Sequence, residues 1–320
     1  MISRRNIRVK VMQSLYTAAT LEKELKPGEA QKILASHFDE TRSLLIYLTW
    51  FLTAVARYAE TFAHQRASKH LPTAEDLNIN TKIAGNEVLW KMLDDPALQE
   101  QFKAEKPESR TDKELIRKIY QQLAETPEYK TYIAEAGRDK VTEKKIIEFI
   151  LNDLLLANEL FTTHVEELYT NWDDDGDMVV QLLMGYIQKP GTYQFKQMMS
   201  ADKEQFAKNL LQTVLEKSQY LQDLIIPKLK NWDPERIALL DMIMMKMGVA
   251  EFLYFETIPP KVTINEYIDL AKEYSTQQSG QFVNGILDNI HKELVQQGKC
   301  KKWTIKRPEP LIHFSLHLQS

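Results

Sequence analysis

The first twenty residues bring together side-chain types that proteins use to bind RNA. Arg4, Arg5 and Arg8 are followed by Gln13 and Tyr16 at spacings that place them along one helix. A guanidinium binds phosphate, an amide can read a base edge, and a phenol ring can stack on an unpaired base. Cations at a helix N-terminus oppose the helix dipole at a cost of about 0.3–1 kcal/mol each, which favours a role outside the helix. A helix docked on both sides, with Tyr16 buried, would explain the same residues equally well.

A second candidate segment opens the last predicted helix. The apolar stripe of this helix runs from Val283 to Leu294, and Phe282 lies to one side of the stripe, near Gln278 and Gln281. An aromatic ring in that position could stack on an unpaired base. The alternative is a residue at the rim of the core. If both segments bind RNA, we expect the first helix and the start of the last one to meet in a single groove for looped-out nucleotides.

No pattern in the sequence predicts a catalytic residue, a cofactor or a metal site. The few glycines form no phosphate-binding loop, the seven histidines are dispersed, and the single cysteine is Cys300. The acidic run at residues 173–177 was compared with a calcium-binding loop by placing Gly176 at position six. Position twelve is then Leu182, where a bidentate Glu is required. We therefore expect a solvated turn and helix cap there, in a protein that is not an enzyme.

The elements that must position the candidate residues are predicted to be helices throughout. Apolar residues recur at helical spacing from Ile7 to Ala18, which predicts a first helix over residues 2–19. No alternating segment bounded by turn residues predicts a strand. Asp233-Pro234 has the residue types that begin a helix, and Thr263 followed by Glu266 has the pattern of a capping box. The fold class is therefore predicted to be all-α.

Breaks at Pro27-Gly28 and at residues 189–191 divide the chain. We predict a first helix within residues 1–20, an inserted helical region over 21–200, a helical core over 201–297, and a basic, proline-containing tail over 298–320. An Asn-Trp-Asp triplet at residues 171–173 occurs again at 231–233. A duplicated helical pair would explain it, and so would chance.

Composition and charge are those of a soluble folded chain. The formal charge is −4, with 43% hydrophobic and 27% charged residues. Residues 1–20 carry four cations and residues 296–307 carry five, with no acid in either segment. Such ends mark either a polyanion partner or solvated termini. The N-terminus is charged rather than apolar, and the most apolar stretch, residues 43–56, is shorter than the ~20 residues that span a bilayer. We therefore expect a cytoplasmic protein with no membrane partner.

Several motifs resemble the NusB family of bacterial transcription antitermination factors. The arginine-rich run and Gln13-Ser14-Leu15-Tyr16 are similar to the opening of the family's first helix. The later matching segments are Glu235-Arg236-Ile237, Asp241, Ile243-Met244-Met245-Lys246, Glu251-Phe252, Ile258-Pro259-Pro260-Lys261-Val262-Thr263-Ile264-Asn265-Glu266, Asp269-Leu270-Ala271-Lys272 and Phe282-Val283-Asn284-Gly285-Ile286-Leu287-Asp288. The resemblance covers residues 1–20 and 202–292.

The resemblance implies an all-helical bundle with no catalytic activity, enlarged here by a long insertion. It implies a factor that binds the single-stranded boxA element of ribosomal-RNA leader transcripts together with a small-subunit ribosomal protein, Nus factor E. Within an antitermination complex, such a factor helps RNA polymerase to pass terminators. The RNA-binding residues would be Arg4, Arg5, Arg8, Gln13, Tyr16, Gln278 and Phe282. The surface for the ribosomal protein would include Asp241, Lys246 and Glu251.

Two features depart from the family pattern. Gln278 stands where the family often has an acid, and Lys246 stands where it commonly has Arg, whose planar fork an ammonium group does not replace. The chain also carries the inserted region, residues 21–200, whose role the sequence leaves open. The alternatives are a non-catalytic helical scaffold in ribosome biogenesis and a relative of the NusB-like domain of ribosomal-RNA cytosine methyltransferases, which need a glycine-rich cofactor fold.

Overall fold

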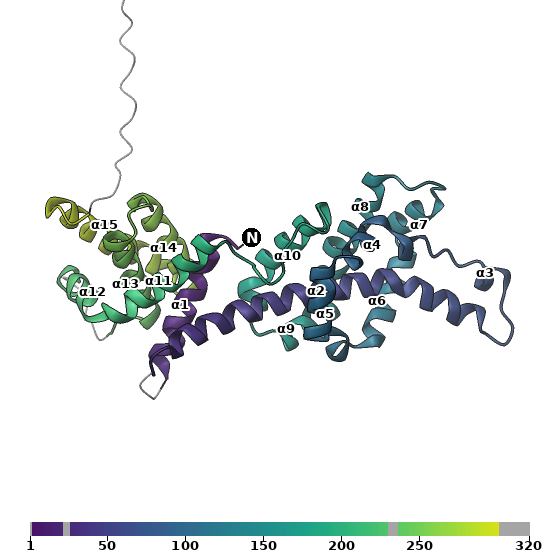
Figure 1. Ribbon diagram of the computed structural model, residues 1–320, viewed down its shortest axis with the longest axis horizontal. Helices are drawn as coiled ribbons and strands as arrows, with labels where there is room; N and C mark the ends of the chain where they lie inside the picture. Colours follow the sequence, from purple (N-terminus) through teal and green to yellow (C-terminus); the bar gives the residue numbers. More distant parts are fainter. Residues whose placement is uncertain (1, 22–25, 230–235, 301–320) are drawn as a thin grey trace, which may run out of the picture. The chain divides into compact units, whose positions relative to one another are not determined.

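The computed structural model describes residues 2–21, 26–229 and 236–300, and every regular element in these ranges is a helix (Figure 1). The predicted all-α fold is confirmed. The chain forms two compact units: unit 1 is Met1–Asn6 and Leu34–Ala201, and unit 2 is Ile7–Ile33 and Asp202–Ser320. Helix α1 (Arg4–Thr20) and helix α2 (Glu29–Ala67) each contribute residues to both units. Within the described ranges, no helix has the length and apolar character needed to cross a bilayer.

Unit 1 consists of short helices that accompany α2. They are α3 (Ala74–Leu77), η1 (Lys82–Gly85), α4 (Glu87–Leu93), α5 (Pro96–Glu105), η2 (Pro107–Arg110), α6 (Lys113–Glu125), α7 (Pro127–Ala134), α8 (Lys140–Phe149), the π-helical turn η3 (Ile150–Leu155), α9 (Glu159–Leu168) and α10 (Trp172–Gln188). Side chains that accept hydrogen bonds from first-turn amides begin many of them, as Asn86 does for α4 and Asp112 does for α6. These caps explain why a sequence of high helix propensity folds into short pieces here.

The core of unit 1 forms along the buried face of α2. Phe51 packs against Phe161 of α9 with ring centroids 4.7 Å apart, and Tyr58 packs against Tyr120 of α6 at 5.5 Å. Tilted aromatic pairs at these distances contribute about 0.5–1.5 kcal/mol beyond their buried area. Two helices distant in sequence are thereby docked on one face of α2.

The acidic run at residues 173–177 is not the solvated turn expected from the sequence. It forms the first turns of α10, and Asp175 is 1% exposed. The Asp175 carboxylate accepts hydrogen bonds from Thr41 Oγ1 and Asn171 Nδ2, both at 2.6 Å. This buried carboxylate joins α10 to α2, a contact between residues far apart in sequence that local pattern does not reveal.

Unit 2 packs around α13 (Leu239–Tyr254), most of which is buried between Asp241 and Phe252. Its other helices are α11 (Ala201–Glu216), α12 (Ser218–Ile225), η4 (Ile226–Lys228), α14 (Pro260–Tyr274) and α15 (Gln277–Gln296), together with most of α1. Gly248 of α13 faces Tyr267 of α14 and Leu287 of α15. A Cβ atom at that position would be 2.9 Å from the Leu287 methyl carbons and 3.3 Å from the Tyr267 ring. Glycine therefore permits this packing, whereas a larger residue would require the Leu287 side chain to move.

The predicted start of α14 is wrong by one turn. The helix begins at Pro260, which occupies the first helical position, so Thr263 lies inside the helix and its side chain caps nothing. The hydroxyl of Thr263 instead donates to Glu251 Oε2 at 2.9 Å. The predicted helix start at Asp233-Pro234, the second Asn-Trp-Asp triplet and residues 301–320 of the predicted tail lie outside the described residues.

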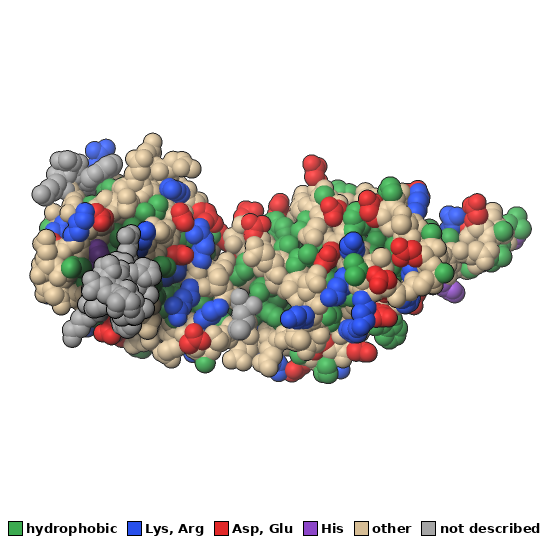
Figure 2. Space-filling model, turned by 90° about the horizontal axis from the view of Figure 1, so that it is seen from above, with side chains coloured by type: hydrophobic (Ala, Val, Ile, Leu, Met, Phe, Trp, Pro, Cys, Tyr) green, Lys and Arg blue, Asp and Glu red, His purple; other side chains and the backbone are tan. Residues whose placement is uncertain are grey.

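The surface shown in Figure 2 carries charges of both signs on both units. Lys and Arg side chains there lie in small groups among Asp and Glu, with apolar side chains between them. On that face no extended area has a single charge, so net charge alone does not mark a binding surface.

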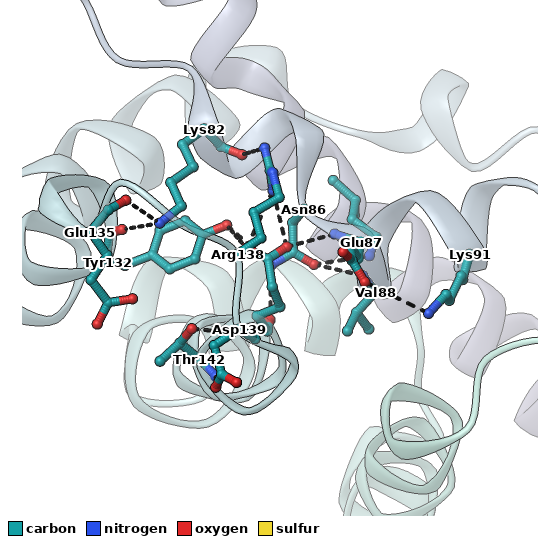
Figure 3. Close-up of polar contacts among 12 residues, drawn as sticks. Lys82, Asn86, Glu87, Val88, Lys91, Tyr132, Glu135, Arg138, Asp139 and Thr142 are labelled. Atoms are coloured by element: carbon teal, nitrogen blue, oxygen red, sulfur yellow. Dashed lines mark hydrogen bonds and ion pairs between the residues drawn. The ribbon is translucent and has the colours of Figure 1, made fainter.

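A buried carboxylate, Glu143 of α8, joins α4 and α7 to its own helix in unit 1. Figure 3 shows the side of this cluster that carries Glu87, Tyr132 and Arg138. Glu143 is 1% exposed and accepts hydrogen bonds from the Tyr132 hydroxyl at 2.7 Å, from Arg138 Nη1 at 3.1 Å and from the backbone N–H of Glu87 at 2.6 Å. The side-chain amide of Asn86 donates to the backbone carbonyl of Glu143 at 2.8 Å. The start of α4 is thereby tied to α7 and α8.

We predict that Glu143→Ala lowers the free energy of unfolding by about 2–4 kcal/mol, because it leaves a phenol, a guanidinium and a backbone N–H without their common acceptor. Arg138 is 35% exposed and can be rehydrated, which keeps the loss below that of a fully buried pair. The matched control is Glu166→Ala on the exposed face of α9, expected to change stability by less than about 0.5 kcal/mol. Urea unfolding measures both, and equal losses would contradict the prediction.

Candidate nucleic-acid interface

Helix α1 buries its middle and leaves its ends accessible. Residues 7–12 are all buried, including Lys10, whereas Arg4 is exposed and Arg5 is partly exposed in the first turn. Near the other end, Gln13 is partly exposed and Tyr16 is 42% exposed. The alternative in which Tyr16 is buried is therefore wrong, and its ring retains accessible surface for a ligand.

Arg8 lies at the centre of a buried polar cluster in unit 2. Its guanidinium holds the Glu251 carboxylate in a two-point contact, Nε to Oε1 at 2.7 Å and Nη2 to Oε2 at 3.1 Å. Arg8 is 2% exposed and Glu251 is not exposed at all. Arg8 Nη1 also lies 3.4 Å from the partly exposed Glu266 of α14. Such fork-to-carboxylate pairs are among the strongest polar contacts in proteins.

The remaining acceptor capacity of Glu251 is met by two hydroxyl groups of α14. The Tyr267 hydroxyl donates to Oε1 at 2.9 Å, and Thr263 donates to Oε2. The Arg8 guanidinium carbon lies 5.5 Å from the centre of the Phe206 ring of α11 and 5.9 Å from that of Tyr267. The cluster therefore connects α1, α11, α13 and α14 through groups with few unmet hydrogen bonds.

Electrostatics in the cluster hold Arg8 in its charged form. Burial alone would lower the pKa of Arg8, but the hydrogen bonds and charge of Glu251 outweigh it and raise the pKa above its ordinary value. Burial, with the negative charge of Glu251, raises the pKa of Tyr267 well above its ordinary value. The phenol therefore stays protonated and remains a hydrogen-bond donor.

This placement corrects two of the sequence predictions. Arg8 was expected to contact RNA and Glu251 to contact a protein partner, but each is buried and bound to the other. A guanidinium sealed in this way cannot reach a phosphate without losing the pair, and Glu251 has no surface to offer a partner. Both residues stabilise the fold, and their contact joins α1 to α13.

The start of α15 presents the other predicted RNA-binding residues. Gln278 is exposed and Phe282 is partly exposed in the first two turns. Thr276 caps the helix in a capping box with Ser279, and the Ser279 hydroxyl donates to Asp241 Oδ2 at 2.9 Å. Asp241 is 6% exposed. The predicted partner residue Asp241 is therefore a buried support for the start of α15, which conflicts with its assignment to a protein-binding surface.

Lys246 is half-buried in the seam between α12 and α13. Its ammonium group donates to the Ser218 hydroxyl at 2.9 Å, and burial lowers its pKa. Of the three residues expected to meet the ribosomal protein, Lys246 alone keeps appreciable exposed surface. Its role in partner binding stays a prediction.

The sequence analysis did not identify the residues that complete the Arg8 cluster. These are Thr263 and Tyr267, which donate to Glu251, and Phe206, whose ring lies beside the Arg8 guanidinium. One signal was available: α1 contains no acidic residue, so a buried cation on it needs a carboxylate from another helix. Within the part of the chain that is described, no group of three or more His, Cys, Asp or Glu side chains is arranged to hold a metal ion. Whether Tyr16 and Phe282 face one groove stays a prediction.

We predict that Arg8→Met lowers the free energy of unfolding by about 3–5 kcal/mol, because it leaves the Glu251 carboxylate buried without a counter-charge. The double variant Arg8→Met, Glu251→Gln should lose less than the sum of the two single variants, because the second change removes that charge. Arg4→Met, an exposed arginine of the same helix, serves as the control, with an effect below about 0.5 kcal/mol. Additive losses in chemical denaturation would show that the pair is not energetically coupled.

Comparisons with known proteins match part of this chain. The NusB family model matches residues 167–292. The transcription antitermination protein NusB of Salinibacter ruber is 35% identical over 140 residues, which are 43% of this chain and 82% of that protein. The proteins of the same name from Methylacidiphilum infernorum and Chloroherpeton thalassium are each 39% identical, over 101 residues (32% of this chain, 70% of that protein) and 97 residues (30% and 46%). No solved structure matches this chain. The expected resemblance is thus confirmed, and the chain belongs to the NusB family.

Proposed function

We propose that this chain is a transcription antitermination factor that binds boxA-type leader RNA of ribosomal-RNA operons together with a small-subunit ribosomal protein, Nus factor E, and promotes read-through by RNA polymerase. The observation that carries the proposal is the match to the Salinibacter ruber protein over most of that protein's length, because its name states transcription antitermination. The relatives are named for this role and not for an enzymatic activity.

The chemistry of the accessible residues supports the proposal. Arg4 and Arg5 supply guanidinium groups for phosphates, Tyr16 and Phe282 supply rings for unpaired bases, and Gln278 supplies an amide for a base edge. Arg8 is removed from this set because it is buried, and its part is to hold α1 in the fold. Two ring-bearing positions with accessible surface fit single-stranded RNA better than a duplex, whose bases are already stacked.

We predict that Tyr16→Ala and Phe282→Ala each weaken binding of a boxA RNA in the presence of the ribosomal protein. Loss of one base-stacking contact costs about 1–3 kcal/mol, which corresponds to roughly a fivefold to 150-fold rise in Kd. Fluorescence anisotropy of a labelled boxA RNA at fixed salt measures the change.

The matched control is Tyr220→Ala on α12, since Tyr220 is 41% exposed and Tyr16 is 42% exposed. It should leave the Kd unchanged, and a boxA RNA of scrambled sequence should bind more weakly than the boxA RNA to every variant. A non-catalytic scaffold without RNA preference would instead bind both RNAs equally, with an affinity set by salt alone. That result, or an unchanged Kd for both ring variants, would refute the proposed interface.

A further inference from the structure

Unit 1 contains a groove of about 1200 Å³ that the family resemblance does not assign. We call it the α2–α5 groove, because one face of α2 forms one wall and α5, η2 and the start of α6 form the other. Its lining residues are Trp50, Thr53, Ala54, Arg57, Tyr58, Glu60, Thr61, Leu93, Gln99, Phe102, Lys103, Lys106, Pro107, Glu108, Ser109, Thr111, Lys113 and Ile116. All of them belong to unit 1.

Aromatic rings lie on both walls of the groove. Trp50 and Tyr58 come from α2 and Phe102 comes from α5, and all three side chains are partly exposed. Tyr58 is fixed from behind by Tyr120 of α6 at 5.5 Å between ring centroids. A ring that is packed on one side and accessible on the other is a suitable platform for a stacked base.

The groove carries more positive than negative charge. Four cations line it, Arg57, Lys103, Lys106 and Lys113, against two carboxylates, Glu60 and Glu108. Among the described residues, Lys113 has only a long, exposed contact with Glu108 at 3.7 Å. No described carboxylate lies within ion-pairing distance of Arg57, Lys103 or Lys106. Three exposed cations along one groove are thus available to an anionic ligand.

One of these cations stands in a strained backbone conformation. Lys106 has φ +48° and ψ +53°, and it is the one residue other than glycine with positive φ in the described part of the chain. The left-handed region costs a residue with a Cβ atom energy that glycine or asparagine would largely avoid. This conformation ends α5, because Lys106 is the C-cap and its backbone N–H donates to the Phe102 carbonyl at 3.0 Å, and it leaves the exposed Lys106 side chain on the groove.

Polar contacts hold the far wall of the groove in place. Ser43 Oγ of α2 donates to Glu105 Oε2 at 2.9 Å, and Arg110 Nη2 lies 3.5 Å from the same oxygen. Thr111 Oγ1 donates to the Tyr47 hydroxyl at 3.2 Å. These contacts fix η2 and the start of α6 against α2, so the groove is formed before any ligand binds, which favours affinity.

We propose that the α2–α5 groove binds single-stranded RNA, with phosphates on Arg57, Lys103 and Lys106 and bases stacked on Trp50 and Phe102. The proposal rests on the proposed function only for the class of ligand, because none of these residues lies on α1 or α15. An acidic peptide would satisfy the cations but would leave the aromatic walls without a matching surface. The groove would thus be a second RNA-binding surface of this chain, in addition to the proposed interface on α1 and α15.

The test uses the full chain and an oligouridylate of about ten nucleotides, within the usual site size for single strands. The groove variant combines Arg57→Gln, Lys103→Gln and Lys106→Asn, the last chosen because asparagine tolerates the left-handed conformation. The control variant combines Lys118→Gln, Lys145→Gln and Lys189→Gln, three exposed lysines of unit 1 outside the groove. Thermal unfolding checks that both variants fold as the native chain does.

The groove variant should bind more weakly and should reduce the slope of log K against log salt by about two, since each phosphate contact on a single strand contributes about 0.7. The control variant should keep the native slope. Oligouridylate should quench the fluorescence of Trp50, and Trp50→Phe should remove that quenching while binding persists. Equal slopes for the two variants, or quenching unaffected by Trp50→Phe, would overturn the proposal.

Two further measurements separate the alternatives. Displacement of the RNA and equal quenching by an oligoglutamate peptide would identify an acidic protein segment as the ligand and overturn the proposal. In parallel, the Tyr16 and Phe282 variants are tested with boxA RNA and the ribosomal protein. If those variants bind boxA RNA normally while the groove variant binds oligouridylate more weakly, the proposed interface on α1 and α15 is refuted and the RNA-binding role of the groove is supported. The reverse result refutes the groove alone.

Discussion

The structure of unit 2 depends on a buried ion pair between Arg8 and Glu251. A guanidinium and a carboxylate that both lose their water must find each other with good geometry, because either one alone would be a buried charge. Here the pair is bidentate, and Thr263 and Tyr267 satisfy the carboxylate further. Helices from the two ends of the chain are thereby held in one register. Because α14 begins at Pro260, Thr263 lies inside the helix, where its hydroxyl donates to the buried Glu251 carboxylate.

The ion pair also limits which arginines of α1 can serve a ligand. Arg4 and Arg5 lie in the first turn with accessible surface, whereas Arg8, within one turn of each, is enclosed. The last arginine of the run therefore stabilises the fold, and only the first two keep accessible surface for the RNA binding that we propose. At the start of α15 the division is similar, since Gln278 and Phe282 reach the surface while Ser279 between them is bound to the buried Asp241.

Unit 1 follows a different plan, because it is organised by one long helix and by carboxylates buried against it or beside it. Asp175 and Glu143 each gather donors from helices that are distant in sequence, and each replaces the hydrogen bonds to water that the group would lose on burial. Such contacts keep short helices in fixed positions. The far wall of the α2–α5 groove is held by other contacts, the hydrogen bonds from Ser43 to Glu105 and from Thr111 to Tyr47.

The sequence by itself determined the helical character of this protein, the main helices and the family. Apolar spacing and high helix propensity are local properties, so the first helix and the helical character of residues 21–200 and 201–297 were predictable, as was the apolar stripe of α15. The exposure of Gln278 and Tyr16 also agrees with their expected places away from the core. Only the tertiary structure decided that Arg8, Asp241 and Glu251 are buried, because burial of a charged side chain depends on a partner elsewhere in the chain. Helical periodicity places a residue on a face, but it does not tell which faces meet another helix and which meet water.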